Sequence, residues 1–229
     1  MVRWISKAGI NTAAAILRLV FATMGSDHYF SAQPAGEESR RPLRVVLAGA
    51  SRDLSTAGGI FSPGRIDHGT AVLLDAAPAP PSSGNLLDIG CGWGPLALTL
   101  GLRSPDAQVY AVDVNERSLA LTRDNAAALK LTNVTAARPE EIDPELRFDT
   151  IWSNPPIRVG KAELHSLLKL WINRLAAGGT AWLVVQRHLG SDSLQKWMAG
   201  EFGPDFQVTR AHSSQGFRIL RVLRATTSL

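Results

Sequence analysis

The chain has 229 residues, of which 45% are hydrophobic and 19% are charged, and its formal net charge is +4. This length fits one sizeable α/β domain with extensions better than two small domains. The single cysteine excludes a disulfide framework and a cysteine-rich zinc site, and the five histidines show no metal-ligand spacing, so we expect no bound metal. A reducing, cytoplasmic compartment is the expected location.

The net charge is unevenly distributed along the chain. Residues 1–47 sum to +3, residues 48–157 to −5 and residues 158–229 to +6. A polyanion such as RNA would be attracted to the basic carboxyl-terminal part. The alternative is an ordinary solvated surface, because charge alone does not separate the two interpretations.

The first 26 residues carry Arg3, Lys7 and Arg18 and no acidic residue, around an alanine-rich run. Arg18 interrupts this run, which falls short of the roughly 20 apolar residues of a membrane helix, so we expect no membrane partner. An appendage or surface helix is favoured over a targeting peptide, and Met24 offers a second start. We divide the chain into a basic arm that is helical or disordered, a lead-in segment that packs on the core, and a catalytic domain: 1–30, 31–84 and 85–229.

Strand and helix patterns alternate along the chain, which predicts an α/β fold with a mostly parallel sheet covered on both faces. A turn-rich loop at 58–70 and a Pro/Ser linker at 77–84 precede the main alternation. We expect strands at residues 43–48, 85–90, 107–114, 134–138, 148–153, 180–186, 206–211 and 216–224. We expect helices at residues 71–77, 95–103, 116–130, 162–176 and 191–202.

The stretch LLDIGCGWGP at residues 86–95 predicts a cofactor loop. Gly90, Gly92 and Gly94 alternate directly after a buried strand, where glycine lets the backbone turn tightly and approach a ligand. The helix that begins at Pro95 directs its N-terminal dipole toward that ligand. The spacing differs from the dinucleotide fingerprint, which has a further residue before the third glycine. The loop therefore indicates a different nucleoside cofactor.

Two carboxylates accompany this loop. Asp88 lies two residues before the first glycine, and Asp113 ends the next strand 25 positions later. A carboxylate at that edge can accept hydrogen bonds from both ribose hydroxyls. The alternative is a glycine turn in a ligand-free protein, with Asp113 capping the next helix. Cys91 and Trp93 lie inside the loop, where packing is favoured over chemistry.

The stretch SNPPI at residues 153–157 follows the next predicted strand, at the edge where open α/β sheets bind ligands. Pro155 and Pro156 stiffen the turn. The side-chain oxygen of Asn154 and the carbonyl of Pro155 then offer two acceptors for the hydrogens of an –NH2 group. Such a site activates an amine for methylation by positioning and electrostatics, without a strong base. The alternative is a simple proline turn.

These motifs resemble those of class I S-adenosylmethionine-dependent methyltransferases, whose amino-methyltransferase signature is N-P-P-aromatic. Ile157 stands where the family has the aromatic residue that stacks on the target base. The resemblance implies a Rossmann-like, seven-stranded, mostly parallel sheet whose last strand is antiparallel, and S-adenosyl-L-methionine as cofactor. The adenine pocket would lie near residues 137–140, without one assigned residue. The implied catalytic residues are Asn154, Pro155, Pro156 and Ile157.

Longer segments resemble the small-subunit ribosomal RNA guanine-N2 methyltransferases, over roughly residues 28–224. They are GIFSPGRIDHGTAVLL at 59–74, SNPPIRVGK at 153–161, TAWLVVQR from 180 and SQGFRILR from 214. In that family the loop before the first motif packs over the cofactor, which implies contacts from Asp67, Gly69 and Thr70. The implied cofactor-binding residues are Asp67, Thr70, Asp88, Gly90, Cys91, Gly92, Gly94, Asp113, Val114 and Asn154. The best-known members carry two tandem methyltransferase-like domains, whereas this chain has one domain and a short arm.

The resemblance implies ribosomal RNA as the partner, with guanine N2 as the methylated atom. Arg158 and Lys161 are the favoured substrate contacts, because they directly follow SNPPI. Further candidate RNA contacts are Arg187, His188, Arg218, Arg221 and Arg224. The alternatives are methylation of a protein glutamine or a small-molecule amine, and a non-catalytic module that binds the cofactor and RNA. The oligomeric state stays open between a monomer and a homodimer.

Overall fold

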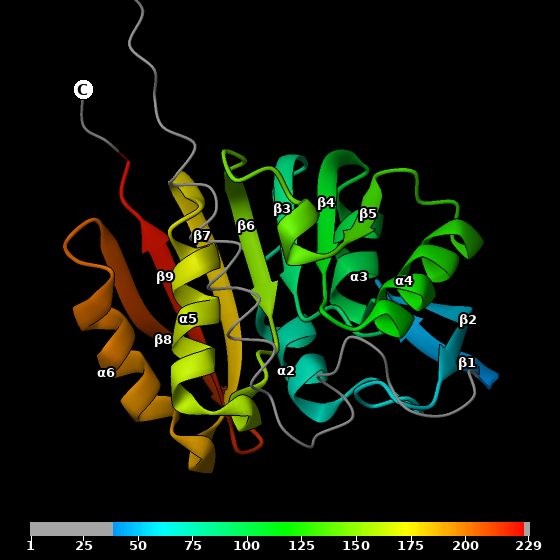
Figure 1. The fold of residues 1–229 in the computed structure, drawn as a ribbon, viewed down its shortest axis with the longest axis horizontal. Helices are drawn as coiled ribbons and strands as arrows, with labels where there is room; N and C mark the ends of the chain where they lie inside the picture. Colours follow the sequence, from blue (N-terminus) through cyan, green and yellow to red (C-terminus); the bar gives the residue numbers. More distant parts are fainter. Residues whose placement is uncertain (1–38, 227–229) are drawn as a thin grey trace, which may run out of the picture.

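The computed structural model describes residues 39–226 (Figure 1), so the predicted arm at 1–30 lies outside the described residues. Seven strands form one sheet in the order β5-β4-β3-β6-β7-β9-β8. The strands are parallel except β9, which is antiparallel to β7 and β8. The predicted Rossmann-like sheet with an antiparallel last strand is confirmed. The strands are β3 (Ser83–Ile89), β4 (Asp106–Val112), β5 (Val134–Ala137), β6 (Phe148–Ser153), β7 (Leu175–Gln186), β8 (Phe206–Ser214) and β9 (Phe217–Arg224).

The sheet separates two hydrophobic cores, because successive residues of a strand face opposite sides. Along β3, Leu87 and Ile89 enter one core, whereas Leu86 enters the other. α5 (Lys161–Ile172) and α6 (Ser191–Glu201) cover the first face, and α5 lies in front of β7 in Figure 1. α2 (His68–Ala76) and α3 (Pro95–Arg103) cover the second face. α4 (Glu116–Ala128) packs on β5 and on the hairpin described next.

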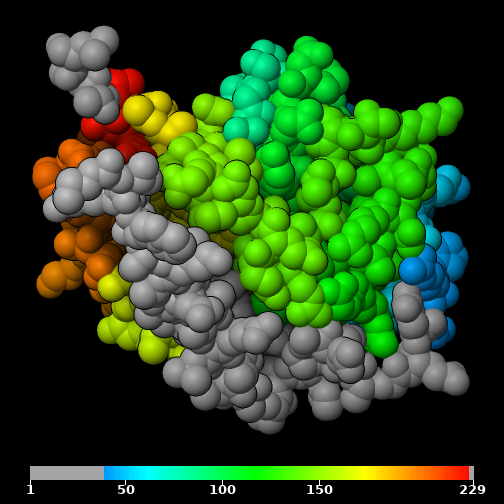
Figure 2. All heavy atoms as spheres, turned by 45° about the horizontal axis from the view of Figure 1, so that its top comes forward, coloured from blue at the N-terminus to red at the C-terminus, as the bar shows by residue number. Residues whose placement is uncertain are grey.

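A separate antiparallel hairpin, β1 (Arg40–Leu47) and β2 (Ala50–Ala57), covers one end of the domain. In the space-filling view, this blue hairpin and the orange segment of α6 and β8 lie at opposite ends of the molecule (Figure 2). The sequence did not predict β2, because ASRDLSTA lacks a sustained apolar alternation. Tertiary contacts stabilise it. The side chain of Asn125 on α4 bonds the N–H of Ser55 at 2.8 Å and its carbonyl at 3.0 Å.

The helix predicted at 162–176 is wrong at its end. α5 stops at Ile172, and buried Leu175 begins β7 by pairing with Phe148. β7 is therefore longer than the strand predicted at 180–186. The glycine pair that was expected to precede the strand lies inside it, at an irregularity in the register with β6.

Other boundaries also differ from the predicted ones, and some of these differences have local reasons. The strand predicted at 107–114 ends at Val112, so the carboxylate that follows lies in a loop. α2 begins at His68, three residues before the predicted helix, because the side chain of Asp67 caps its first N–H groups. β3 begins at Ser83, inside the predicted Pro/Ser linker, because it pairs there with β4.

Candidate active site

A cavity of about 650 Å³ opens at the carboxyl edge of the sheet, beyond the ends of β3, β4 and β6. This is the edge at which α/β sheets bind ligands. A smaller cavity shares Asp67, Gly90, Gly92 and Asn154 with it. The candidate residues that line the large cavity are Asp67, Gly90, Gly92, Asp113, Val114, Asn154, Pro155, Pro156, Ile157 and Arg158. Thr70, Asp88 and Cys91 line only the smaller cavity, and Gly94 and Lys161 line neither.

The two sequence motifs meet because β3 and β6 are neighbours. Ile89 and Ser153, the last residues of these strands, are paired in the sheet. The Ser153 hydroxyl also donates a hydrogen bond to the Ile89 carbonyl at 2.8 Å. Gly90 and Asn154 directly follow these two strands, so the cofactor loop and the SNPPI turn lie side by side.

The glycine loop presents open backbone to the cavity. Gly90 and Gly92 have φ values of +77° and +58°, and a Cβ built on either would meet no atom within 4 Å. Left-handed conformations of this kind favour glycine. Gly94 differs from them, since a Cβ there would lie 3.1 Å from Leu98 and from Thr122. Gly94 therefore serves the start of α3, and the first two glycines shape the cavity.

Asp88 is a fully buried carboxylate with one oxygen engaged. Its Oδ2 accepts a hydrogen bond from the N–H of Ala97 at 3.0 Å, whereas Oδ1 has no partner among the described residues. Burial raises the pKa of Asp88 to about 8, against the lowering effect of the Ala97 N–H, and the charge of Asp113 adds to the rise. A buried oxygen without a donor is costly, so this position favours a ligand that brings a donor or a positive charge.

Asp113 is held by backbone N–H groups at the base of the cavity. Its Oδ2 accepts from Gly92 and its Oδ1 accepts from Asn115, both at 2.9 Å. Burial raises the pKa of Asp113 to about 6, although these two hydrogen bonds act in the opposite direction. The N-cap of α4 is Asn115, whose side chain accepts from Arg117 and Ser118. The alternative in which Asp113 caps this helix is therefore wrong.

Asn154 is fixed in one orientation by two side chains of the preceding loop and helix. Its Nδ2 donates to Asp67 Oδ2 at 2.9 Å and to Thr70 Oγ1 at 3.1 Å. A carboxylate only accepts hydrogen bonds, so the amide nitrogen must face Asp67 and the amide oxygen must face away. The hydrogen bonds of the Asn154 side chain within residues 39–226 are both made by Nδ2, which leaves Oδ1 available to a ligand. Asp67 and Thr70, expected beside the cofactor, thus hold the Asn154 side chain.

Cys91 lies in the loop but its chemistry is suppressed. The thiol is buried in the core beneath α2 and α3, and it contacts the Thr122 hydroxyl at 3.6 Å. Burial, with the charges of Asp113 and Asp88, raises the pKa of the thiol well above its usual value. The side chain is a packing residue, as the sequence suggested for this position.

Several residues of the cavity wall were not singled out by the sequence. Pro139, after β5, lies where the adenine pocket was expected, but its short segment contained no distinctive pattern. Gln215 and Phe217 lie at the β8–β9 turn, in the segment SQGFRILR, which resembled the family without assigning a role to either residue. The wall residues to which the sequence assigned no role include Phe61, His68, Trp171, Gln215 and Phe217.

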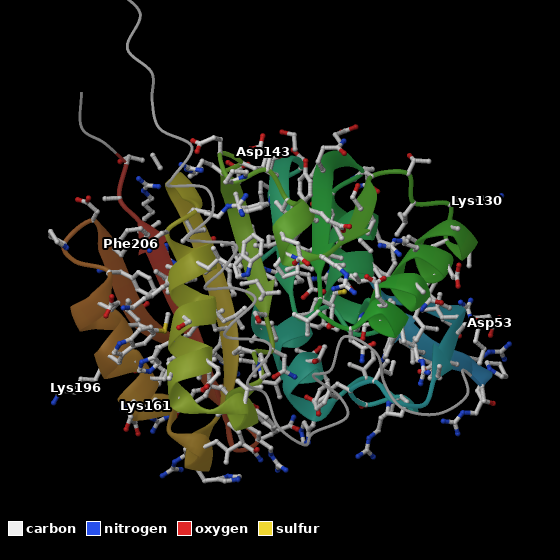
Figure 3. The ribbon with its side chains drawn as sticks, viewed as in Figure 1. Asp53, Lys130, Asp143, Lys161, Lys196 and Phe206 are labelled. Carbon is white, nitrogen blue, oxygen red and sulfur yellow. The ribbon has the colours of Figure 1, made fainter. Side chains whose placement is uncertain are left out.

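The basic candidates fall into two groups. Arg158 is exposed and lines the cavity. Lys161 is the first residue of α5 (Figure 3) and does not line the cavity. Arg187 and His188 are also exposed, next to cavity residues. The other three candidates make structural contacts. Arg218 pairs with Asp192, Arg221 lies 5.9 Å from the Trp182 ring, and Arg224 donates to the Leu175 carbonyl.

Two negative findings apply to the described part of the chain. Within residues 39–226, no helix is long and apolar enough to cross a membrane. The same residues include no cluster of three or more His, Cys, Asp or Glu side chains that could hold a metal ion.

Residues 51–221 match the family model of the methyltransferase small domain. The chain belongs to this family. An uncharacterized protein of Bacillus subtilis, YbxB, is 30% identical over 86% of the chain and 98% of its own length. Ribosomal RNA small subunit methyltransferase C of Pseudomonas entomophila is 33% identical over 86% of the chain but only 58% of its own length. The chain thus spans about half the length of the relatives with this name.

A solved structure gives a similar result. The T. thermophilus 16S rRNA N2 G1207 methyltransferase (RsmC), described in complex with AdoMet and guanosine, superposes with a TM-score of 0.68 and 25% identity. The match covers 83% of this chain and 52% of that one. The seven-stranded fold and the position of the cavity at the carboxyl edge of its sheet are those of a class I methyltransferase domain.

Proposed function

We propose that this protein transfers a methyl group from S-adenosylmethionine to the exocyclic N2 amine of a guanine in small-subunit ribosomal RNA. One observation carries the proposal: the Asn154 amide is clamped through its nitrogen, so that its oxygen is left for a substrate N–H. An acceptor held in this way suits the N–H of an –NH2 group, but it is too weak a base to remove the proton of a hydroxyl.

The cofactor fits the residues of the large cavity and of the smaller cavity beside it. Asp88 Oδ1, buried and without a partner among the described residues, suits the positively charged amine of the methionine part. The open sides of Gly90 and Gly92 leave room for a ligand against the backbone. Asp113 would accept from the ribose hydroxyls, and Val114 and Pro139 offer apolar walls to the adenine.

Bound S-adenosylmethionine supplies an electrophilic methyl group. The protein's own task is to orient the amine: Asn154 Oδ1 and the Pro155 carbonyl would each accept one of its hydrogens. These two hydrogen bonds withdraw the hydrogens from the plane of conjugation and direct the nitrogen lone pair toward the methyl group. Asp67 assists from behind, because its carboxylate polarises the Asn154 amide and raises the negative charge on Oδ1.

Two observations favour a guanine of ribosomal RNA over other amines as the substrate. Relatives that match most of this chain carry the name ribosomal RNA small subunit methyltransferase C, and a solved relative of that name contains guanosine. The exposed side chains of Arg158, Lys161, Arg187 and His188 belong to the two segments that follow β6 and β7, which form part of the cavity rim. Basic groups beside the cavity would attract the phosphates of a flanking RNA strand.

A transfer assay with methyl-labelled cofactor tests the proposal. The substrates are unmodified small-subunit ribosomal RNA, assembled small subunits and total protein depleted of RNA. We expect label in RNA or subunits, and its loss with Asn154→Ala. Label in protein alone would contradict the RNA assignment, and label in none of them with intact cofactor binding would favour a non-catalytic module.

A further inference from the structure

A target base needs a surface on which to stack. The residue that follows the two prolines usually provides it, but here that residue is Ile157, whose side chain is aliphatic. Ile157 lines the cavity and packs against the core beneath α5 and α6. An isoleucine offers van der Waals contact but no π face. Since an unstacked base gains much of its binding energy from aromatic stacking, an aromatic residue elsewhere in the cavity would have to take this role.

Three aromatic residues of the cavity wall, besides His68, can be compared. Trp171 is fully buried in the core, so it cannot offer its face to a base. Phe61 is 49% exposed, but it also lines the smaller cavity with Asp88, on the side of the cofactor. Phe217 lines only the large cavity. It is the first residue of β9 and packs on the core beneath α2 and α3.

Phe217 and Ile157 therefore belong to opposite faces of the sheet, and both reach the same cavity at its edge. Asn154 directly follows β6, at the edge of the sheet where both side chains line the cavity. The ring of Phe217 is also close to the Asn154 clamp. A Cβ placed on Gly69 would lie 2.9 Å from Phe217 Cε1 and 3.1 Å from Asp67 Oδ2. The ring and the carboxylate that holds Asn154 thus pack on the same glycine.

The Phe217 ring is held in place before any substrate arrives. It follows a two-residue turn in which Gln215 and Gly216 have φ values of +50° and +81°. Both values are left-handed, which is typical of the tightest β-hairpin turns. The His68 ring packs against Phe217 at a centroid distance of 5.4 Å, and His68 Nε2 hydrogen-bonds Gln215 Oε1. The Gly216 carbonyl accepts from Arg187 N at 2.8 Å.

We propose that Phe217, supported by His68 and Gln215, is the surface on which the target base stacks, opposite Ile157. This inference rests on the proposed function, since it presumes that the substrate is a nucleobase. Under this inference, the part of the cavity wall formed by α2 and the β8–β9 turn selects a substrate that has a planar ring. The base would lie between an aromatic and an aliphatic side chain, with its amine at Asn154.

The test compares four variants in steady-state transfer to unmodified small-subunit RNA: Phe217→Leu, Phe217→Tyr, the double variant Phe217→Leu with Ile157→Phe, and Phe206→Leu. Phe206 is an aromatic residue of the same hairpin at its other end, outside the cavity (Figure 3). Phe217→Leu should lower kcat/KM for RNA by about 10- to 100-fold, the range expected for one lost stacking contact. Its affinity for S-adenosylhomocysteine should stay close to that of the wild type, which also verifies folding.

Phe217→Tyr keeps the ring and should retain most activity, and Ile157→Phe should restore activity to Phe217→Leu by supplying a ring from the other wall. Phe206→Leu should resemble the wild type. The inference is overturned if Phe217→Leu is as active as Phe206→Leu, if cofactor affinity falls as much as kcat/KM, or if neither ring-bearing variant exceeds Phe217→Leu. A wild type that methylates no RNA would instead overturn the proposed function, and this inference with it.

Discussion

The two sides of the cavity are built differently. The cofactor side consists of the backbone of the loop after β3 and of two carboxylates, Asp88, which is fully buried, and Asp113, which is half-buried. The substrate side consists of side chains from segments far apart in the sequence, such as Asp67, Asn154 and Phe217, with cations at its rim. A cofactor of fixed shape can be held by one short motif, whereas a large substrate requires contacts that only the folded chain assembles.

The largest effect should come from the substrate side. Asn154→Ala removes the oriented acceptor and should lower kcat by about 100- to 1,000-fold, the range for losing one preorganised hydrogen bond in a transition state. Cofactor affinity should remain close to that of the wild type, as measured by calorimetry. Asn173→Ala, which removes an exposed amide at the end of α5, is the matched control. Near-normal kcat in Asn154→Ala would refute the amine-positioning mechanism.

A substitution on the cofactor side should change the affinity for S-adenosylmethionine. Asp88→Asn keeps an acceptor for the Ala97 N–H but removes the negative charge. We expect the Kd for S-adenosylmethionine to rise by about 100-fold, because a buried charged partner is lost. Asp149→Asn serves as the control, since Asp149 also accepts from a backbone N–H, that of Asn85, away from the cavity. Equal affinities in the two variants would exclude Asp88 from the cofactor site.

The raised pKa of Asp88, about 8, predicts a pH dependence. Below pH 8 the ligand-free carboxyl is largely protonated, so binding a cationic amine must release a proton. Affinity should therefore increase with pH by up to about tenfold per unit until pH 8. The free protein should behave oppositely: a raised folded-state pKa stabilises the fold at low pH, and this stabilisation is lost as the pH rises through 8. Calorimetry and melting temperatures from pH 6 to 9 measure both effects. A flat affinity profile, identical to that of Asp88→Asn, would contradict the proton release.

A smaller effect should follow from Asp67→Asn. Asparagine is as good an N-cap as aspartate, so α2 should keep its first turn. The Asn154 amide loses a charged acceptor, and kcat should fall by about tenfold, the equivalent of one charge-assisted hydrogen bond. The cofactor Kd reports whether Asp67 acts through Asn154: a rise in Kd with unchanged kcat would place Asp67 on the cofactor instead.

The smallest effect should come from the rim. Arg158→Ala should raise the KM for RNA. It should also reduce the slope of log affinity against log salt concentration by about 1, which corresponds to one lost phosphate contact. Arg147→Ala is the control, because Arg147 is an exposed cation just before β6, at the other edge of the sheet. If both variants show the same salt slope as the wild type, RNA does not contact the rim at Arg158.

The same contrast explains what the sequence could predict. The glycine loop and SNPPI are local signals, so the fold and the position of both motifs at one edge of the sheet followed from them. β2 was missed because a tertiary partner, Asn125, satisfies its backbone. The Asp67–Asn154 contact joins residues 87 positions apart, and the nearness of Phe217 to Gly69 depends on the β8–β9 turn. No local pattern encodes either distance.

The most direct test of the central claim is the identity of the methylated atom. Small-subunit ribosomal RNA without the modification would be incubated with the protein and cofactor, digested to nucleosides and analysed by mass spectrometry beside Asn154→Ala. The account predicts N2-methylguanosine with the wild type and a 100-fold or greater loss of it with the variant, on the order expected for one lost transition-state contact. Methylation at a ring nitrogen or a ribose hydroxyl, or equal product from both proteins, would contradict it.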